Sequence, residues 1–218
     1  MKRCVTEQSV RVLSEGHEFD VRSSHFFHHF NRLQRLVGLA LDSIWNTTKL
    51  RLNGATLGQG VSVGGKLKVY CAPGGRIIIG NRVRFRSGFQ LNPLAHSLPN
   101  AIWVGRNGTL LVEDGAGLSA TTIVCASRIT IGHSTLVGSG TQIYDTDFHP
   151  LTAEARRRHE PPLSSPVVIE PECFIGAFCI ILKGVTIGRG SVVGAGSVVT
   201  RCIPPGEVWA GNPARRVR

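Results

Sequence analysis

Aliphatic residues recur at every sixth position through the C-terminal part of the chain, without a break. A small or β-branched residue follows each of the first five by four positions, and glycine often comes directly after the aliphatic residue. The aliphatic positions are Ile169, Ile175, Ile181, Ile187, Val193 and Val199, and the small positions are Cys173, Cys179, Val185, Ser191 and Ser197.

A six-residue period indicates a coil built from short strands and turns. An isolated strand alternates its faces every second residue, and a helix of 3.6 residues per turn would scatter positions six apart over different faces. A short strand followed by a turn fits the period, and three such units close a triangular coil with the aliphatic residues inside. Stacked coils bury a continuous column. The pattern predicts an all-β solenoid, a parallel β-helix of roughly six coils, whose hand the period alone does not set.

Further hexads extend this prediction toward the N-terminus. We expect the β-helix to cover residues 55–204, with an N-terminal segment at 1–54 and a basic C-terminal tail at 205–218. The strong hexads are Ile131, Val137 and Ile143, and the weaker ones are Leu57, Val63, Val69, Ile79, Phe85, Leu91, Val112, Leu118 and Val124.

The N-terminal segment has a different period. Between Ser24 and Leu50 the apolar residues are spaced as on one face of a helix, at Phe26, Phe30, Leu33, Val37, Leu41 and Ile44. This predicts an amphipathic helix. It packs on the coil or on a neighbouring subunit, or it rests on a membrane surface through its basic residues and Trp45. We expect His25, His28 and His29 to be surface residues and not metal ligands.

Charge and cysteine content narrow the classes of partner. The net charge of +11 indicates an anionic partner. Nucleic acid is disfavoured because aromatic residues are few and do not alternate with basic ones. Cofactor phosphates, anionic lipid and anionic glycan stay open. The six cysteines form no CxxC pair and no zinc spacing, and no apolar leader or run of about 18 apolar residues occurs. The chain is expected to be cytoplasmic, reduced and free of metal.

The repeat is interrupted after Ile143 by the sequence YDTDFHPLTAEARRRHEPPLSSP. We expect residues 150–166 to leave the coil as a loop, with Asp145, Asp147 and His149 at its base. A hydroxyl becomes a good nucleophile when a neutral imidazole takes its proton, and a carboxylate can fix the tautomer of that imidazole. The sequence therefore predicts His149 as a general base. In the alternative interpretation, His149 caps the loop and the two aspartates form turns.

The other polar residues carry weaker predictions. His133 occupies an ordinary turn position, and His96 and His159 lie in irregular segments, so we expect all three to be solvated. The loop arginines Arg156 to Arg158 either meet an anionic glycan or keep the loop soluble.

Two stretches resemble a known family. The C-terminal sequence IGAFCIILKGVTIGRGSVVGAGSVVTRCIPPGEVWAGNPARRVR resembles the hexapeptide-repeat acetyltransferases of the galactoside, maltose and nodulation-factor type. The segment DTDFHP is similar to that of the members that O-acetylate polysaccharides. The resemblance covers residues 55–218 and implies a left-handed β-helix, a homotrimer, and an active site between adjacent subunits.

The resemblance also implies roles for single residues. His149 matches the catalytic histidine, and Asp145 or Asp147 the acid that orients it. The positions that match the acetyl-CoA site are Ala177, Ala195, Thr200, Arg215 and Arg218. Members of the galactoside type use an asparagine upstream, where this chain has Ser119, Ala120 and Thr121.

These observations predict an acetyl-CoA-dependent O-acetyltransferase. It acts on a sugar hydroxyl of a bacterial surface or capsular glycan or its precursor, in the cytoplasm, with peripheral membrane contact through residues 24–50. The alternatives are a non-catalytic trimeric scaffold or glycan-binding protein, and an N-acetyltransferase of an amino sugar. The sequence leaves open the acceptor, the length of the acyl chain, the aspartate that orients His149 and the membrane contact.

Overall fold

The computed structural model describes the backbone of residues 21–218 and the side chains of residues 34–218. The chain divides into two units, Met1–Leu36 and Val37–Arg218, and the second contains every strand found among residues 21–218. Helix α1 (Val21–Leu52) precedes the first strand. The side chains of the predicted surface histidines His25, His28 and His29 lie outside the described residues.

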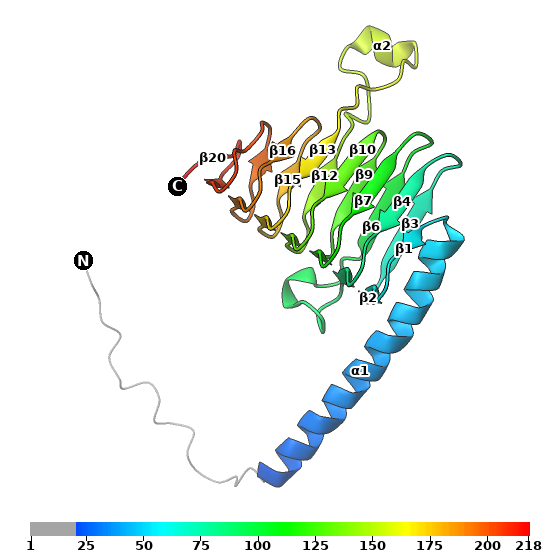
Figure 1. The fold of residues 1–218 in the computed structure, drawn as a ribbon, viewed down its shortest axis with the longest axis vertical. Coiled ribbons are helices and arrows are strands. Elements are labelled where there is room, and N and C mark those ends of the chain that lie inside the picture. The colour runs from blue at the N-terminus through cyan, green and yellow to red at the C-terminus, as the bar shows by residue number, and fades with distance from the viewer. Residues whose placement is uncertain (1–20) are drawn as a thin grey trace, which may run out of the picture. The chain divides into compact units, whose positions relative to one another are not determined.

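Three sheets form the three sides of the β-helix (Figure 1). In each coil the chain passes through the first, the second and then the third sheet. The first sheet contains β1 (Thr56–Leu57), β4 (Arg76–Ile79), β7 (Thr109–Val112), β10 (Arg128–Ile131), β13 (Val167–Ile169) and β16 (Thr186–Ile187). The second contains β2 (Ser62–Gly64), β5 (Arg84–Arg86), β8 (Gly117–Ser119), β11 (Leu136–Val137), β14 (Phe174–Ile175), β17 (Val192–Val193), β19 (Val208–Ala210) and β20 (Arg215–Arg216). The third contains β3 (Leu67–Cys71), β6 (Asn100–Val104), β9 (Thr122–Cys125), β12 (Gln142–Tyr144), β15 (Ile180–Ile181) and β18 (Val198–Val199).

All neighbouring strands pair in parallel except β19 and β20, which form an antiparallel pair. The prediction of a parallel β-helix is therefore confirmed. The segment 205–218, expected as a basic tail, contains this last pair, so its backbone continues the second sheet.

The strong hexads supply the buried column. Each of their aliphatic residues is at most 2% exposed, from Ile131 and Val137 through Ile143 to Ile175 and Val199. Two of the weaker assignments were wrong, Leu91 and Val124. From Leu118 to Ile123 the inward positions are five residues apart, whereas the equivalent positions of the next coil, Val137 and Ile143, are six apart. The phase therefore shifts, and Ile123 points inward in place of Val124.

Leu91 belongs to an excursion that the sequence analysis missed. Residues 87–99 leave the coil between β5 and β6 and contain the short 3₁₀ helix η2 (Pro93–Ala95), capped by Asn92. The inward position of this coil is taken by Ile102 in β6. The Asn92–Pro93 pair is a turn signal that could have revealed the break.

Helix α1 covers the edge of the first coil with the part that belongs to the second unit. Asn46 Nδ2 donates to the carbonyl oxygens of Val63 and Gly65, at 3.2 and 2.8 Å. Asp42 Oδ2 accepts from the Gly65 amide at 2.8 Å, and Leu50 is fully buried. An open sheet edge would expose unpaired backbone groups, so these contacts close the N-terminal end of the β-helix.

The opposite face of the same helix is exposed, at Val37, Leu41, Ile44 and Trp45. Contact of this face with a membrane or a neighbouring subunit stays a prediction. No helix in the described part of the chain is long and apolar enough to cross a bilayer.

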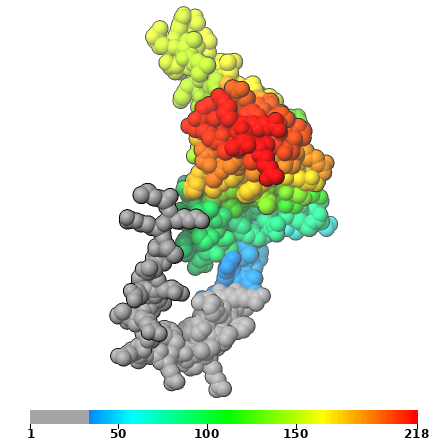
Figure 2. Space-filling model, turned by 90° about the vertical axis from the view of Figure 1, so that its left-hand side faces the viewer, coloured from blue at the N-terminus to red at the C-terminus, as the bar shows by residue number. Residues whose placement is uncertain are grey.

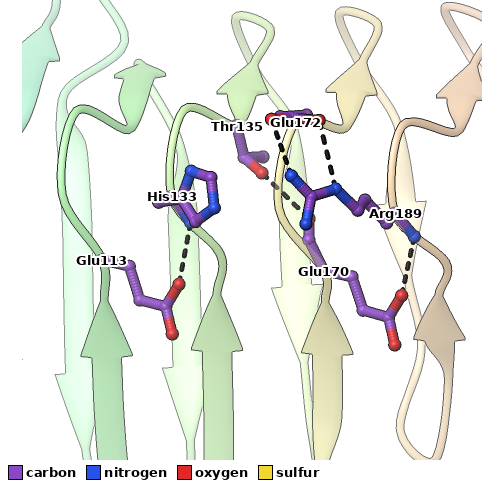
Figure 3. Close-up of polar contacts among 6 residues, drawn as sticks. All are labelled: Glu113, His133, Thr135, Glu170, Glu172 and Arg189. Carbon is purple, nitrogen blue, oxygen red and sulfur yellow. Dashed lines mark hydrogen bonds and ion pairs between the residues drawn. The ribbon is translucent and has the colours of Figure 1, made fainter.

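Carboxylates tie successive coils together at the corner between the first and second sheets (Figure 3). Glu113 accepts from the backbone amide of His133 at 2.9 Å, and Glu170 from that of Arg189 at 2.7 Å. Glu172 forms a two-point ion pair with the Arg189 guanidinium, which lowers the pKa of the Glu172 carboxyl. These side chains replace backbone partners at a tight corner and stabilise the stack.

One strand separates the inward and outward contributions to stability. In β4, Ile79 is 1% exposed and its neighbour Ile78 is 39% exposed. Replacing Ile79 with Ala leaves a cavity in the column and should lower the free energy of unfolding by about 3 kcal/mol, measured by urea denaturation at fixed protein concentration. The control Ile78→Ala should stay within about 1 kcal/mol. Equal losses in the two variants would contradict the assigned phase of the coil.

Candidate active site

The loop between β12 and β13 leaves the coil through a short antiparallel ribbon. Thr146 bridges Ser164, Asp147 N donates to Leu163 O at 3.1 Å, and Ser165 N donates to Asp145 O at 2.9 Å. Beyond the ribbon the loop contains helix α2 (Ala153–Arg157), and Figure 2 shows the loop, in yellow-green, standing out from the coils. The ribbon fixes the base of the loop, where the three predicted catalytic residues lie.

A strained turn presents His149 at this base. Phe148 has a φ of 64°, and the His149 amide donates to Asp147 O at 2.7 Å, which together make a γ-turn. A bulky residue rarely adopts a positive φ, and such strain is concentrated at functional sites. The His149 side chain is exposed. Among the side chains of residues 34–218, none forms a hydrogen bond or ion pair with its imidazole.

The Asp145 carboxylate bonds to the backbone of the preceding coil and not to His149. Its side chain is fully buried, and its two carboxylate oxygens accept from the amides of Ala126 and Ser127, both at 2.7 Å. Burial, together with the nearby Asp145 charge, raises the pKa of the Cys125 thiol to about 12, so that thiol stays protonated. Both oxygens of Asp145 are engaged in closing the coil, and the structure does not bring this carboxylate to His149.

Asp147 is held differently. One oxygen forms an ion pair with Lys183 Nζ at 3.0 Å. The other oxygen, Oδ2, is buried without a hydrogen-bond partner among the described residues. A buried carboxylate oxygen without a donor is costly, so this atom is ready to accept a hydrogen bond. His149, two residues further on, has an imidazole without a partner. The geometry therefore favours Asp147 over Asp145 as the partner of His149.

Sequence reasoning missed Lys183. It lies one coil beyond Asp147, where β12 and β15 pair in the register Gln142↔Ile180 and Ile143↔Ile181. The signal that could have found it is the coil repeat itself, because residues at the same corner of successive coils are neighbours.

A cavity of about 510 Å³ lies between the loop and the outer face of the third sheet. It places an apolar hollow directly beside the turn that carries His149. The residues that line it are Trp103, Val124, Ala126, Thr146, Phe148 and Pro162.

The predicted cofactor residues lie on the C-terminal coils. Ala177 and Ala195 occupy the same corner of adjacent coils, and each packs closely on the glycine of a neighbouring coil, Gly138 and Gly176 respectively. Thr200 directly follows β18, at the opposite end of that strand from Ala195, and its side chain is exposed. At Ala177 and Ala195 this corner presents backbone and methyl groups, and the exposed ring of Phe178 lies directly beside them.

The basic residues of β20 differ in their partners. Arg216 Nε forms an ion pair with Glu207 at 3.3 Å, and Arg215 donates to the carbonyl of Ala214. Both Arg215 and Arg218 are exposed, and no described side chain pairs with Arg218. Two arginines at the C-terminal end are thus available for an anion.

The remaining candidates stay apart from the loop base. His133 lies at the corner of Figure 3, and His96 caps η2. In the loop, Arg156 donates to the carbonyls of Pro150 and Leu151, and Arg158 pairs with Glu154 and Glu160. No group of three potential metal ligands gathers among residues 34–218.

Substitutions of the two aspartates should differ in their effect on the free energy of unfolding. Replacing Asp145 with Asn places an amide group against two backbone donors, and should lower the free energy of unfolding by roughly 2–4 kcal/mol. The matched change Asp147→Asn, at a partly exposed site, should cost less than about 1 kcal/mol. Urea denaturation of both variants measures the difference, and a larger loss at Asp147 would reverse the assigned roles.

Comparison with known proteins agrees with this architecture. Residues 166–201 match the family model described as the hexapeptide repeat of succinyl-transferase. A putative acetyltransferase from Schizosaccharomyces pombe is 41% identical over 97 residues, which make up 44% of this chain and 46% of that protein. The chain spans less than half the length of the curated relatives that it matches.

Two solved structures share the fold. A hexapeptide-repeat acetyltransferase from Vibrio cholerae superposes with a TM-score of 0.54 and 25% identity, over 90% of this chain and 92% of that chain. The same protein is also known in complex with acetyl coenzyme A. The N-acyltransferase AntD from Bacillus cereus, in complex with dTDP and 3-hydroxybutyryl-CoA, gives a TM-score of 0.61 at 20% identity, over 79% of this chain and 87% of that chain. The chain therefore contains the hexapeptide repeat over residues 166–201 and shares the left-handed β-helix fold of these acyltransferases.

Proposed function

We propose that this protein transfers an acetyl group from acetyl-CoA to a sugar hydroxyl, with His149 as general base. One observation carries the proposal. At the base of the loop, His149 has an exposed imidazole without a partner and closes a strained γ-turn that begins at Asp147, whose Oδ2 is buried and unpaired. This is the arrangement that proton transfer from a hydroxyl requires.

His149 and Asp147 divide the work of proton transfer. Acetyl-CoA supplies the acyl group as an activated thioester. His149 takes the proton of the acceptor hydroxyl as it attacks, and later returns that proton to the leaving thiolate. In the reacting complex, Asp147 Oδ2 would accept a hydrogen bond from the other ring nitrogen and so stabilise the charged imidazolium. Lys183 acts as a positioning residue, because its ion pair fixes the Asp147 carboxylate.

The residues at the C-terminal end fit a coenzyme A molecule. Ala177 and Ala195 are small, so a pantetheine arm could approach the backbone there, beside the exposed ring of Phe178. Thr200 lies at the opposite end of strand β18 from Ala195. Arg215 and Arg218 would bind the phosphates, because guanidinium groups form charge-assisted bonds to phosphate oxygens.

The acceptor and the assembly complete the proposal. The DTDFHP segment supports O-acetylation of a bacterial surface glycan or its precursor, and the fold shared with AntD supports N-acylation of an amino sugar as the second candidate. A homotrimer would provide the second wall of the site, since in one chain His149 is exposed. The proposed location is the cytoplasm, where acetyl-CoA is available, with membrane contact through the exposed face of α1.

Replacing His149 with Ala should lower kcat by about 100-fold or more, because the hydroxyl loses its base. Thiol release from acetyl-CoA, measured with a panel of bacterial sugars and oligosaccharides, checks this. The control His133→Ala removes an imidazole at a corner away from the loop and should stay within about twofold.

Binding separates the competing interpretations. The His149→Ala variant should bind CoA as tightly as the wild type in calorimetry. A wild-type protein that binds no CoA would indicate the scaffold or glycan-binding interpretation. A variant as fast as the wild type would leave the fold and cosubstrate in place and identify a different base.

The arginines in and after the last strand offer a second test. Replacing Arg218 with Ala should raise the Kd for CoA by roughly tenfold, since one charge-assisted contact to a phosphate is lost. Arg216→Ala is the matched control, because Glu207 already neutralises that guanidinium. Calorimetry at two salt concentrations should show a weaker salt dependence for Arg218→Ala alone. An equal change in both variants would contradict the phosphate assignment.

A further inference from the structure

Two large aromatic rings stack on the outer face of the third sheet. Tyr70 in β3 and Trp103 in β6 are register partners, and their ring centroids lie 6.2 Å apart with an interplanar angle of 21°. Tyr70 is 51% exposed and Trp103 is 42% exposed. Large aromatic surfaces are usually buried or used in recognition, so a stacked and exposed pair calls for a ligand.

The same outward column continues to the loop. In register, Trp103 pairs with Val124, and Val124 pairs with Tyr144. The Tyr144 ring contacts Phe148 edge-on, with centroids 5.1 Å apart. Phe148 is the central residue of the γ-turn that precedes His149. One line of side chains thus joins the stacked pair to the proposed base.

Trp103 belongs to both features. It lines the 510 Å³ cavity under the loop together with Val124 and Phe148, and it forms one half of the stacked pair. The cavity is therefore the inner end of a longer apolar track. From Tyr144 to Tyr70 the track crosses three strand spacings of about 4.8 Å, roughly 14 Å, which is longer than a single sugar ring.

Polar side chains flank the track on the same face. Lys68, Thr122 and Gln142 stand two residues before Tyr70, Val124 and Tyr144 in their strands. Together with Ala101, which lies between Lys68 and Thr122, they form a parallel column, in which Gln142 already accepts from the Tyr144 hydroxyl. A pyranose has an apolar face of C–H groups and a rim of hydroxyls, and a flat aromatic surface beside hydrogen-bonding groups matches both. An acyl chain would favour an enclosed apolar channel, whereas these rings are open to solvent.

We propose that this face binds an extended saccharide acceptor. Sugar residues stack on Tyr70 and Trp103, and the residue to be acylated enters the cavity beside His149. This inference rests on the proposed function and adds the class of acceptor, an oligosaccharide or polysaccharide in place of a free monosaccharide. Trp103 and Tyr70 then determine specificity for acceptor length.

The test compares acceptors of increasing length in full-length protein. Malto-, cello- and chito-oligosaccharides of one to six sugars serve as probes in the thiol-release assay, with Tyr70→Ala, Trp103→Ala and Trp103→Phe. We expect the KM for the hexasaccharide to rise by roughly tenfold or more in the two Ala variants, with kcat changed less, and the loss to grow with acceptor length. Trp103→Phe should restore part of the affinity. The control Phe89→Ala removes an exposed ring from the 87–99 excursion and should have no effect.

Direct binding keeps this inference separate from catalysis. Calorimetry of the His149→Ala protein with the hexasaccharides should show binding that Trp103→Ala weakens. If binding depends on Trp103 but no acceptor is acylated, the saccharide site stands and the proposed function fails.

Three outcomes would overturn the saccharide site. The first is turnover with equal effects of Trp103→Ala at every acceptor length, and the second is a wild-type protein that binds none of the probes. The third is a change in oligomeric mass of Trp103→Ala by light scattering, which would make the stacked pair a contact between subunits.

Discussion

The pairing of each coil with the next is the interaction on which the rest of the structure depends. Most strands are two to four residues long, too short to be stable alone, and each is held by parallel neighbours on adjacent coils. This pairing fixes the register from one end of the β-helix to the other. Inward residues then form the buried column, and outward residues form straight columns along the coil axis. A functional site on this fold is therefore assembled from residues far apart in the sequence.

The loop interrupts this pairing, and Asp145 compensates for the interruption. At the corner between the third and first sheets, the amides of Ala72 and Gly105 donate to carbonyl oxygens of the next coil, Val104 O and Cys125 O. Ala126 stands at the equivalent position, but the next coil leaves for the loop there. The Asp145 carboxylate accepts from Ala126 and from its neighbour in place of the missing carbonyl. One aspartate of the motif thus belongs to the fold, whereas Asp147 keeps one carboxylate oxygen without a partner.

The sequence predicted what depends on the period and failed where the outcome depends on register. The unbroken hexads located the buried column because every sixth residue of a regular coil points into the same core. Val124 was placed inward because a spacing of five residues in place of six leaves no mark on a single sequence. Lys183 and the pair Tyr70 and Trp103 escaped for a different reason: their contacts exist only once coils are aligned. The loop was visible as a break, but the division of roles between Asp145 and Asp147 required their hydrogen bonds.

The outward columns of side chains place the proposed cosubstrate and acceptor sites on opposite sides of the loop. The residues that fit coenzyme A lie on the coils after the loop, and the stacked aromatic pair lies on the coils before it. His149 stands between them, at the corner where the loop leaves the third sheet. Donor and acceptor would then reach the base from opposite ends of one sheet face, without competing for the same surface. On this proposal a long glycan would need no enclosed pocket, because the register set by coil pairing already aligns the Tyr70 and Trp103 rings.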